Sequence, residues 1–240
     1  MFLVEKGSVY VKKIIGIIVF CLILINNFAF AETTFTDIDD HWAEDVIKKW
    51  QSSGYISGYP DGSFKPDNPV TRAELSKILT VVFELKDSDQ LTFEDVLEEE
   101  WYYPYLEKSA KYIPVYPLPT HYDSNSPYID NWNRNNVFLP NEKAIRGHVA
   151  ESLVELKAKK ENIDIGNVSY HEIAPKIYET FKDAELDTTV HGVPFNVERM
   201  NKYIWLAYDM GIMVGYDGCF NQYCYMTRAE LITAINKIIQ

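Results

Sequence analysis

Basic residues are scarce in this chain relative to acidic ones. Its 240 residues contain 23 Lys and Arg against 35 Asp and Glu, which gives a formal net charge of −12. A nucleic-acid-binding surface needs clustered positive charge, so this balance argues against nucleic acid as a partner. A membrane-spanning stretch is also missing, because the apolar run at residues 14–25 falls short of the roughly 20 residues that a spanning helix needs.

That apolar run instead belongs to a leader. Lys6, Lys12 and Lys13 precede it, and Ala29-Phe30-Ala31 follows it with the small-x-small pattern that signal peptidase reads. We therefore predict that residues 1–31 are a signal peptide. The protein would be secreted, with no membrane span after cleavage.

Cysteine is scarce as well. Of three cysteines, Cys21 would be lost with the leader, which leaves Cys219 and Cys224 in an oxidising compartment. Either a disulfide or two reduced thiols in a turn fits this spacing. No metal-ligand set accompanies them, and the turns at Asp61 and Asp217 lack the EF-hand spacing. The sequence predicts neither a metal nor a cofactor.

Familiar catalytic motifs are absent too. There is no GxSxG elbow and no HExxH pair. A cell-wall glycoside hydrolase is the alternative, with Glu98, Glu99 and Glu100 as available acids. Acids adjacent in sequence rarely form a catalytic pair, because its two carboxyl groups must face each other across the scissile bond. We therefore predict that the protein is not an enzyme.

What the chain does contain is one pattern in three copies, together with 17 Tyr and 5 Trp. Such rings are common in secreted proteins that contact sugars. Each copy opens with Phe-x-Asp, at residues 35–37, 93–95 and 181–183, and continues through an aromatic-rich helical stretch and a turn to a second apolar helix headed by Arg. The arginines are Arg72, Arg146 and Arg228, and each lies eight residues after a Phe, without a gap.

These copies predict a mainly α fold of three helix-loop-helix units, with short extended segments in the loops. The boundaries are 32–92, 93–180 and 181–240. The middle copy is degenerate, because a long stretch rich in Pro, Asn and Tyr replaces its Gly-Tyr turn. Residues 157–180 are predicted to be a linker, where Ser169 and Glu172 offer a capping box that Pro175 disturbs. A lone unit cannot bury its apolar stripe, so the three should pack around a shared helical centre.

The arginines need an explanation beyond helix capping. Thr71-Arg72-Ala73-Glu74 and its counterpart at 227–230 are capping boxes, which account for Thr and Glu. A cation in the first turn is mildly unfavourable beside the helix dipole, and Arg146 persists although its turn has lost both capping residues. A helix start plus a guanidinium suits a bound carboxylate, with a structural ion pair as the alternative at Arg146.

At these residues the sequence resembles the S-layer homology (SLH) family, as a protein with three SLH motifs. The motifs that carry the resemblance are Gly58-Tyr59-Pro60-Asp61-Gly62 and Thr71-Arg72-Ala73-Glu74, with echoes at 215–218 and 227–230. The resemblance implies a pseudo-threefold, mostly helical spindle. It also implies binding of secondary cell-wall polysaccharide, often through pyruvylated N-acetylmannosamine, on a bacterial envelope.

The family's arginine that meets the acidic sugar maps onto Arg72 and Arg228, and less closely onto Arg146. The resemblance further implies contacts from a Trp near the motif start and from the Gly and Asp of the loop. These would be Trp42, Gly58 and Asp61, with Trp101, Gly215 and Asp217 as counterparts. A third class of function is open: an envelope interaction protein that recruits another polypeptide through residues 112–132.

Overall fold

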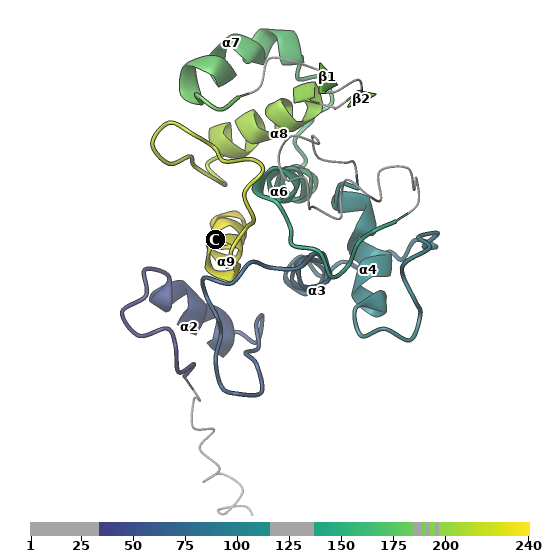
Figure 1. The fold of residues 1–240 in the computed structure, drawn as a ribbon, viewed down its shortest axis with the longest axis vertical. Helices are drawn as coiled ribbons and strands as arrows, with labels where there is room; N and C mark the ends of the chain where they lie inside the picture. The colour runs from purple at the N-terminus through teal and green to yellow at the C-terminus, as the bar shows by residue number, and fades with distance from the viewer. Residues whose placement is uncertain (1–33, 116–136, 185–188, 191–192, 195–196) are drawn as a thin grey trace, which may run out of the picture. The chain divides into compact units, whose positions relative to one another are not determined.

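The computed structural model describes residues 34–115, 137–184, 189–190, 193–194 and 197–240. The predicted leader and most of residues 112–132 lie outside these ranges. The described residues from Thr36 onward belong to one compact unit. This part of the chain is mainly helical, as predicted (Figure 1). Its elements are α2 (Glu44–Ser52), α3 (Arg72–Val82), α4 (Tyr103–Ser109), η1 (Ala110–Tyr112), α6 (Arg146–Glu161), α7 (Tyr170–Thr180), β1 (Thr189–Val190), β2 (Val193–Pro194), α8 (Val197–Asp209) and α9 (Arg228–Ile239).

The starts of α3 and α9 follow from local chemistry. Thr71 caps α3 and Thr227 caps α9, and each exchanges hydrogen bonds with the Glu three residues on. This reciprocal box satisfies two backbone N–H groups that a helix start would otherwise leave without acceptors. Helix α6 begins after Ile145, whose side chain makes no capping bond. The capping predictions for these three helices are confirmed.

Residues 157–180, predicted to be a linker with an uncertain helix after Ser169, are largely helical. Residues 157–161 form the last turn of α6, and α7 occupies Tyr170–Thr180 with Pro175 inside it. Ser169 precedes α7, but its side chain makes no capping hydrogen bond. Ile173 and Ile177 are buried, and α7 packs against α8. Burial of this apolar face stabilises a helix that its local sequence supports poorly.

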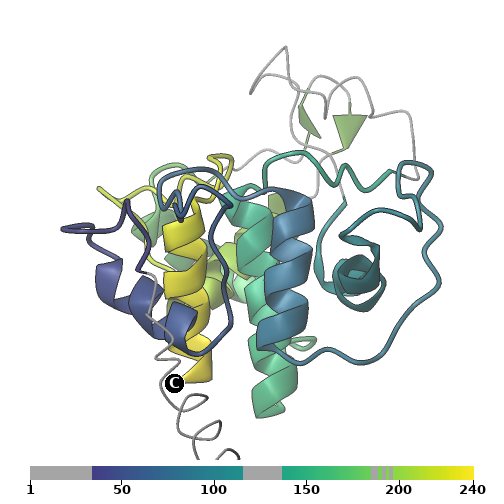
Figure 2. The same cartoon turned by 90° about the horizontal axis from the view of Figure 1, so that it is seen from below.

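The segments before α3, α6 and α9 meet in a closed ring. Val70 N donates to Met226 O (2.9 Å), Met226 N donates to Ala144 O (2.9 Å), and Ala144 N donates to Val70 O (2.8 Å). All three helices therefore start at one place. Figure 1 views them nearly end-on, and Figure 2 shows them side by side. Their inward faces supply buried Leu75, Leu79, Leu153, Leu231 and Ile235.

Each Phe-x-Asp opening has a structural role. Its Asp accepts two successive backbone N–H groups, from a buried Phe and from the residue that follows, at 2.7 to 2.8 Å. The acceptors and donors are Asp37 with Phe64 and Lys65, Asp95 with Phe138 and Leu139, and Asp183 with Phe220 and Asn221. The residue after each Phe has positive φ, so this carboxylate holds a strained turn in place.

Candidate functional site

The three arginines occupy equivalent places at the starts of α3, α6 and α9. Each Nε donates to the carbonyl oxygen of a Phe from elsewhere in the chain, and each guanidinium lies over that Phe ring. The pairs are Arg72 with Phe138 (2.7 Å), Arg146 with Phe220 (3.1 Å) and Arg228 with Phe64 (2.9 Å). Each arginine therefore connects the start of its own helix to the distant segment that contains the Phe.

The outer nitrogens of the arginines differ in their partners. Arg228 Nη1 lies 3.0 Å from Glu74 Oε1, and Arg146 Nη1 lies 2.9 Å from Glu230 Oε1. Arg72 instead donates from Nη2 to Pro114 O (2.9 Å), and its side chain is 1% exposed. Arg228 and Arg146 each border an open groove, whereas Arg72 borders neither of these two grooves.

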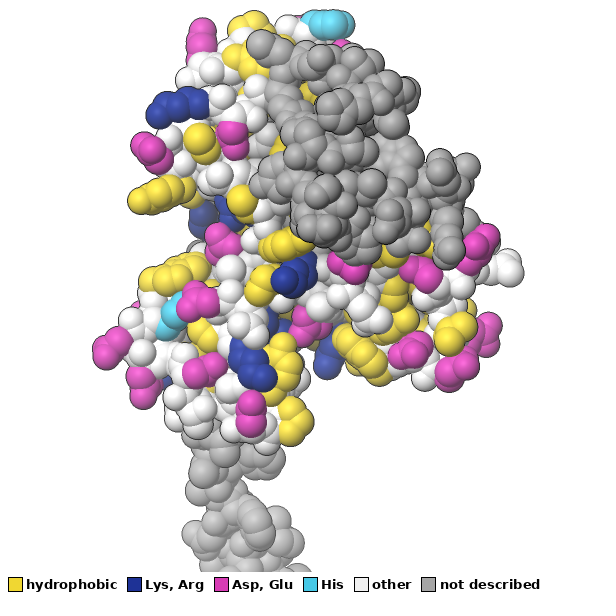
Figure 3. Space-filling model, viewed as in Figure 1, with side chains coloured by type: hydrophobic (Ala, Val, Ile, Leu, Met, Phe, Trp, Pro, Cys, Tyr) yellow, Lys and Arg dark blue, Asp and Glu magenta, His cyan; other side chains and the backbone are white. Residues whose placement is uncertain are grey.

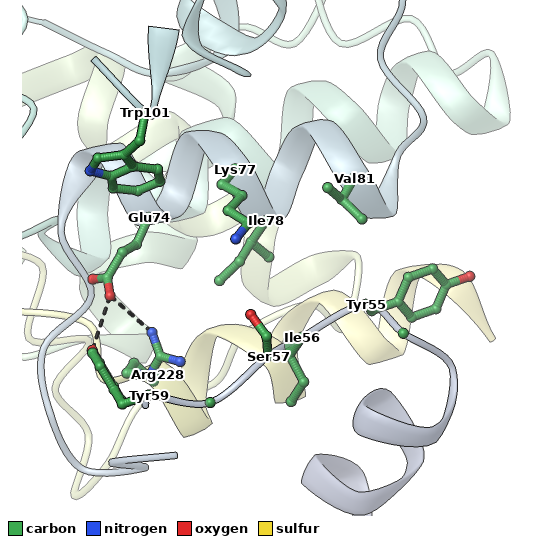
Figure 4. A pocket seen from close by; sticks show the side chains of 12 residues that line it. Tyr55, Ile56, Ser57, Tyr59, Glu74, Lys77, Ile78, Val81, Trp101 and Arg228 are labelled. Carbon is green, nitrogen blue, oxygen red and sulfur yellow. Dashed lines mark hydrogen bonds and ion pairs between the residues drawn. The ribbon is translucent and has the colours of Figure 1, made fainter. Parts of the chain in front are cut away.

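The first groove, called here the Arg228 groove, has a volume of about 330 Å³ (Figure 4). Helix α3 forms one side, the loop before Tyr59 forms the other, and Trp101 closes one end with 52% of its surface exposed. The lining residues are Gly54, Tyr55, Ile56, Ser57, Gly58, Tyr59, Glu74, Lys77, Ile78, Val81, Trp101 and Arg228. An exposed indole beside a cation and a hydroxyl can stack on a sugar ring and hold a negative group.

A short polar network sits at the closed end of this groove. The Tyr59 hydroxyl donates to Glu74 Oε1 at 3.1 Å, and Figure 4 shows Tyr59 and Arg228 meeting the same carboxylate. Burial raises the pKa of Tyr59, while the nearby Arg228 charge acts in the opposite direction. Tyr59 is therefore a neutral donor at physiological pH. Glu74 is held in the capping box, so this network positions Arg228 from α3.

The second groove, called here the Arg146 groove, has a volume of about 500 Å³. Helix α9 and the loop at 212–216 form its sides, and Trp42 lies at its edge with 62% of its surface exposed. The lining residues are Trp42, Arg146, Ile212, Met213, Val214, Gly215, Tyr216, Asn221, Cys224, Tyr225, Met226, Thr227, Glu230, Thr233, Ala234 and Lys237. Arg146 Nη2 donates to Val214 O at 3.2 Å, which ties its tip to this loop.

The structure groups the sequence-predicted residues across the copies rather than within them. Gly58 shares a groove with Arg228 and Trp101. Gly215 shares the other groove with Arg146 and Trp42. Each groove thus takes its loop and helix from one copy, its Arg from a second and its Trp from a third.

The predicted loop aspartates lie outside both grooves. Asp61 accepts hydrogen bonds from Ser63 N (3.0 Å) and Ser63 Oγ (2.6 Å), which hold the pKa of Asp61 below its usual value. The backbone oxygen of Asp217 accepts from Lys182 Nζ. Both residues stabilise turns in this structure. Cys219 and Cys224 remain two thiols, half-buried and exposed respectively, and only Cys224 borders a groove.

The corresponding face of α6 carries different chemistry. His148 stands where α3 has Glu74, is fully buried, and burial lowers its pKa well below the usual value, with a further contribution from Arg72. Glu151 is 2% exposed and forms an ion pair with Arg199. Tyr203 donates to Glu155. Helix α8 packs against this face, where the other two helices border grooves.

Sequence reasoning missed Tyr59, Lys77 and Lys237 as groove residues and assigned Glu74 only to a helix cap. The register of the copies offered a signal for the two lysines, because the residues five and nine positions after Arg72 and after Arg228 line the grooves. Within the described part of the chain, no group of three or more His, Cys, Asp or Glu side chains could hold a metal ion. Among the same residues, no helix combines the length and apolar character needed to cross a membrane.

Comparison with known proteins finds a family match for the N-terminal part of the described chain. Residues 34–76 match the family model described as S-layer homology domain. Cell surface glycoprotein 1 of Acetivibrio thermocellus is 44% identical over 70 residues, which are 28% of this chain and 3% of that protein. The cellulosome-anchoring protein of the same organism is 29% identical over 158 residues, 62% of this chain and 34% of that protein.

An S-layer protein of Bacillus licheniformis is 28% identical over 164 residues, 66% of this chain and 17% of that protein. The chain thus spans about a third or less of the length of these relatives.

Proposed function

Because residues 34–76 match the S-layer homology domain model, we propose that this protein is secreted and attaches non-covalently to a bacterial cell wall. The ligand is an anionic secondary cell-wall polysaccharide, of the pyruvylated kind. Residues 32–92, 93–180 and 181–240 are three copies of one unit arranged around a pseudo-threefold axis. The Arg228 groove and the Arg146 groove are the binding sites.

One observation carries this proposal. Two separate grooves have the same plan, with a helix-start arginine, a glycine loop and an exposed tryptophan, although different copies supply these parts in each. Packing alone does not account for two large exposed indoles, because water-facing rings of this size gain little from folding. Stacking on sugar rings explains their exposure, and the adjacent arginine explains a preference for acidic sugars.

The charge of the protein limits how the ligand is recognised. With a formal net charge of −12, the chain repels an anionic polymer at long range. Figure 3 shows one face of the molecule, and Asp and Glu side chains are spread over its described surface. Binding must therefore depend on short-range contacts inside the grooves, where Arg228, Arg146 and the lysines lie.

The grooves favour binding over hydrolysis. Among the residues that line them, each groove has a single carboxylate, Glu74 or Glu230, and each is engaged by an arginine and a helix cap. A glycoside hydrolase needs two facing carboxyl groups about 5 to 10 Å apart. We therefore propose an anchoring role without catalysis.

Co-sedimentation with purified cell-wall sacculi tests this function. The wild-type protein should pellet with sacculi that retain their polysaccharide, and should stay in solution after mild acid has removed the pyruvyl groups. The Trp42→Ala/Trp101→Ala variant should lose most pelleting, because it removes both exposed rings. Leu97→Ala is the matched control, since Leu97 is 53% exposed and lines neither groove. Equal pelleting of all samples would overturn the proposal.

A further inference from the structure

The two grooves carry their second cation at different places. Five residues after the arginine that begins each helix, α3 has Lys77, α9 has Thr233 and α6 has Glu151. Nine residues after it, α3 has Val81, α9 has Lys237 and α6 has Glu155. The lysines and their counterparts on α3 and α9 all line the grooves. The equivalent positions thus hold one cation on α3, one on α9 and two carboxylates on α6.

In the Arg228 groove, Lys77 faces the same space as Arg228. Figure 4 shows its amino group pointing from α3 toward the opposite loop, where Ser57 lies. Lys77 forms no ion pair with another described residue. Arg228 Nη1 is engaged by Glu74, whereas Nη2 makes no hydrogen bond to another described residue. Lys77 Nζ also lies 5.9 Å from the centroid of the Tyr105 ring, and the Arg228 guanidinium lies over the Tyr59 and Phe64 rings, with 7% of the residue exposed. Both cations line this groove, and no described carboxylate engages Lys77 or Arg228 Nη2.

In the Arg146 groove, the cation lies farther along the helix. Thr233 occupies the position of Lys77, and Lys237 lies four residues later, about 6 Å along the axis of α9. Lys237 also forms no ion pair with another described residue. Arg146 has both outer nitrogens engaged, by Glu230 and by Val214 O. The two grooves therefore present different charge patterns to a ligand.

Helix α6 presents the opposite charge. Glu151 is buried against Arg199, and Glu155 accepts from Tyr203, so α8 occupies this face. The arginine that would belong here, Arg72, donates to the carbonyl oxygens of Phe138 and Pro114. An anionic ligand at α6 would meet two carboxylates, Glu151 and Glu155. The Arg72 guanidinium is buried there and donates to backbone carbonyl oxygens, so α6 offers no third site of this kind.

We propose that Lys77 and Lys237 determine where each groove holds the negative charge of its saccharide, so that the chain has two distinct anionic-saccharide sites. The Arg228 groove takes a sugar carboxylate between Arg228 and Lys77. The Arg146 groove takes a saccharide whose charge lies about one helical turn farther along, at Lys237. This inference rests on the proposed function.

Tryptophan fluorescence separates the two grooves, because each has its own exposed indole. Trp42→Phe keeps Trp101 as the groove indole that reports the Arg228 groove, and Trp101→Phe keeps Trp42 for the Arg146 groove. The other three tryptophans are common to both parents, so they cannot account for a difference between the parents. The probe is a short N-acetylmannosamine oligosaccharide that carries a pyruvic acid acetal, with the same oligosaccharide lacking pyruvate as its control. Each parent is titrated alone and with one lysine replaced. The replacement is the residue found at the equivalent position of the other groove, Thr for Lys77 and Val for Lys237.

Lys77→Thr should weaken pyruvylated-probe binding about tenfold in the Trp42→Phe parent and leave it unchanged in the Trp101→Phe parent. Lys237→Val should show the reverse pattern. Parents that respond to the probe while neither lysine changes its Kd by more than about twofold would overturn this inference and leave the proposed function standing. Parents that respond to neither oligosaccharide would overturn both.

Discussion

Arg228 Nη1 lies 3.0 Å from Oε1 of Glu74, although 154 positions separate the two residues in the chain. Arg146 and Glu230 repeat the contact at 2.9 Å. Each pair joins the start of one central helix to the start of another, at the edge of a groove. The residues that border the grooves therefore also hold the helices together, and changes to them affect folding and binding at once.

Replacement of Arg228 by Lys should lower the free energy of unfolding by about 2 kcal/mol. Lysine cannot keep both the Nε bond to Phe64 O and the ion pair with Glu74. Urea denaturation followed by circular dichroism measures the change. Lys86→Arg is the control, because Lys86 is exposed and lines neither groove. A loss below about 0.5 kcal/mol would show that the arginine contributes little to the fold.

Replacement of Asp37 by Asn should cost about 1 to 2 kcal/mol. The amide has one acceptor oxygen, whereas the carboxylate accepts from both Phe64 N and Lys65 N. Lys65 has a φ of 57°, so its turn depends on these bonds. The exposed neighbour Asp39 serves as the matched control in the same denaturation experiment. Equal stability of Asp37→Asn and Asp39→Asn would contradict this role.

Buried His148 should make the protein less stable in mild acid. Its pKa is lowered in the folded state by burial and by Arg72, so the folded protein keeps the ring neutral. The unfolded chain protonates this ring below about pH 6.5, which favours unfolding as the pH falls. The His148 contribution should reduce the free energy of unfolding by up to about 1.4 kcal/mol per pH unit below that value.

Comparison of wild type with His148→Gln isolates this effect. The difference in unfolding free energy between the two proteins should change between pH 7 and pH 5, and should be constant above pH 7.5. Substitution of the exposed His171 provides the control. Parallel pH profiles for wild type and His148→Gln would show that the ring does not control acid stability.

Removal of the Arg199 side chain should destabilise the interface between α6 and α8. Arg199→Met leaves the carboxylate of Glu151, which is 2% exposed, without its arginine partner, at a cost of about 2 kcal/mol. The Glu151→Gln/Arg199→Met double variant should recover part of that loss. A double-mutant cycle with a coupling energy near zero would argue against the pair.

The helix starts, the turns and the register of the copies were predictable from the sequence, because their causes are local. Thr71 and Thr227 cap helices through groups three residues away, and the Phe-to-Arg spacing is visible without a structure. Helix α7 stayed uncertain in the sequence, since Pro175 weakens its local signal and contacts with α8 stabilise it. The copy boundaries and the binding roles of the arginines stay predictions.

The sequence by itself determined that an arginine begins each of three helices and that Trp42 and Trp101 precede two others. Only the tertiary structure decided that Trp101 lines the same groove as Arg228, that Trp42 lines the same groove as Arg146, and that Arg72 borders neither groove. The physical reason is the distance along the chain over which each kind of interaction acts. Capping and turn formation act over three or four residues, whereas each groove depends on packing among segments more than a hundred residues apart.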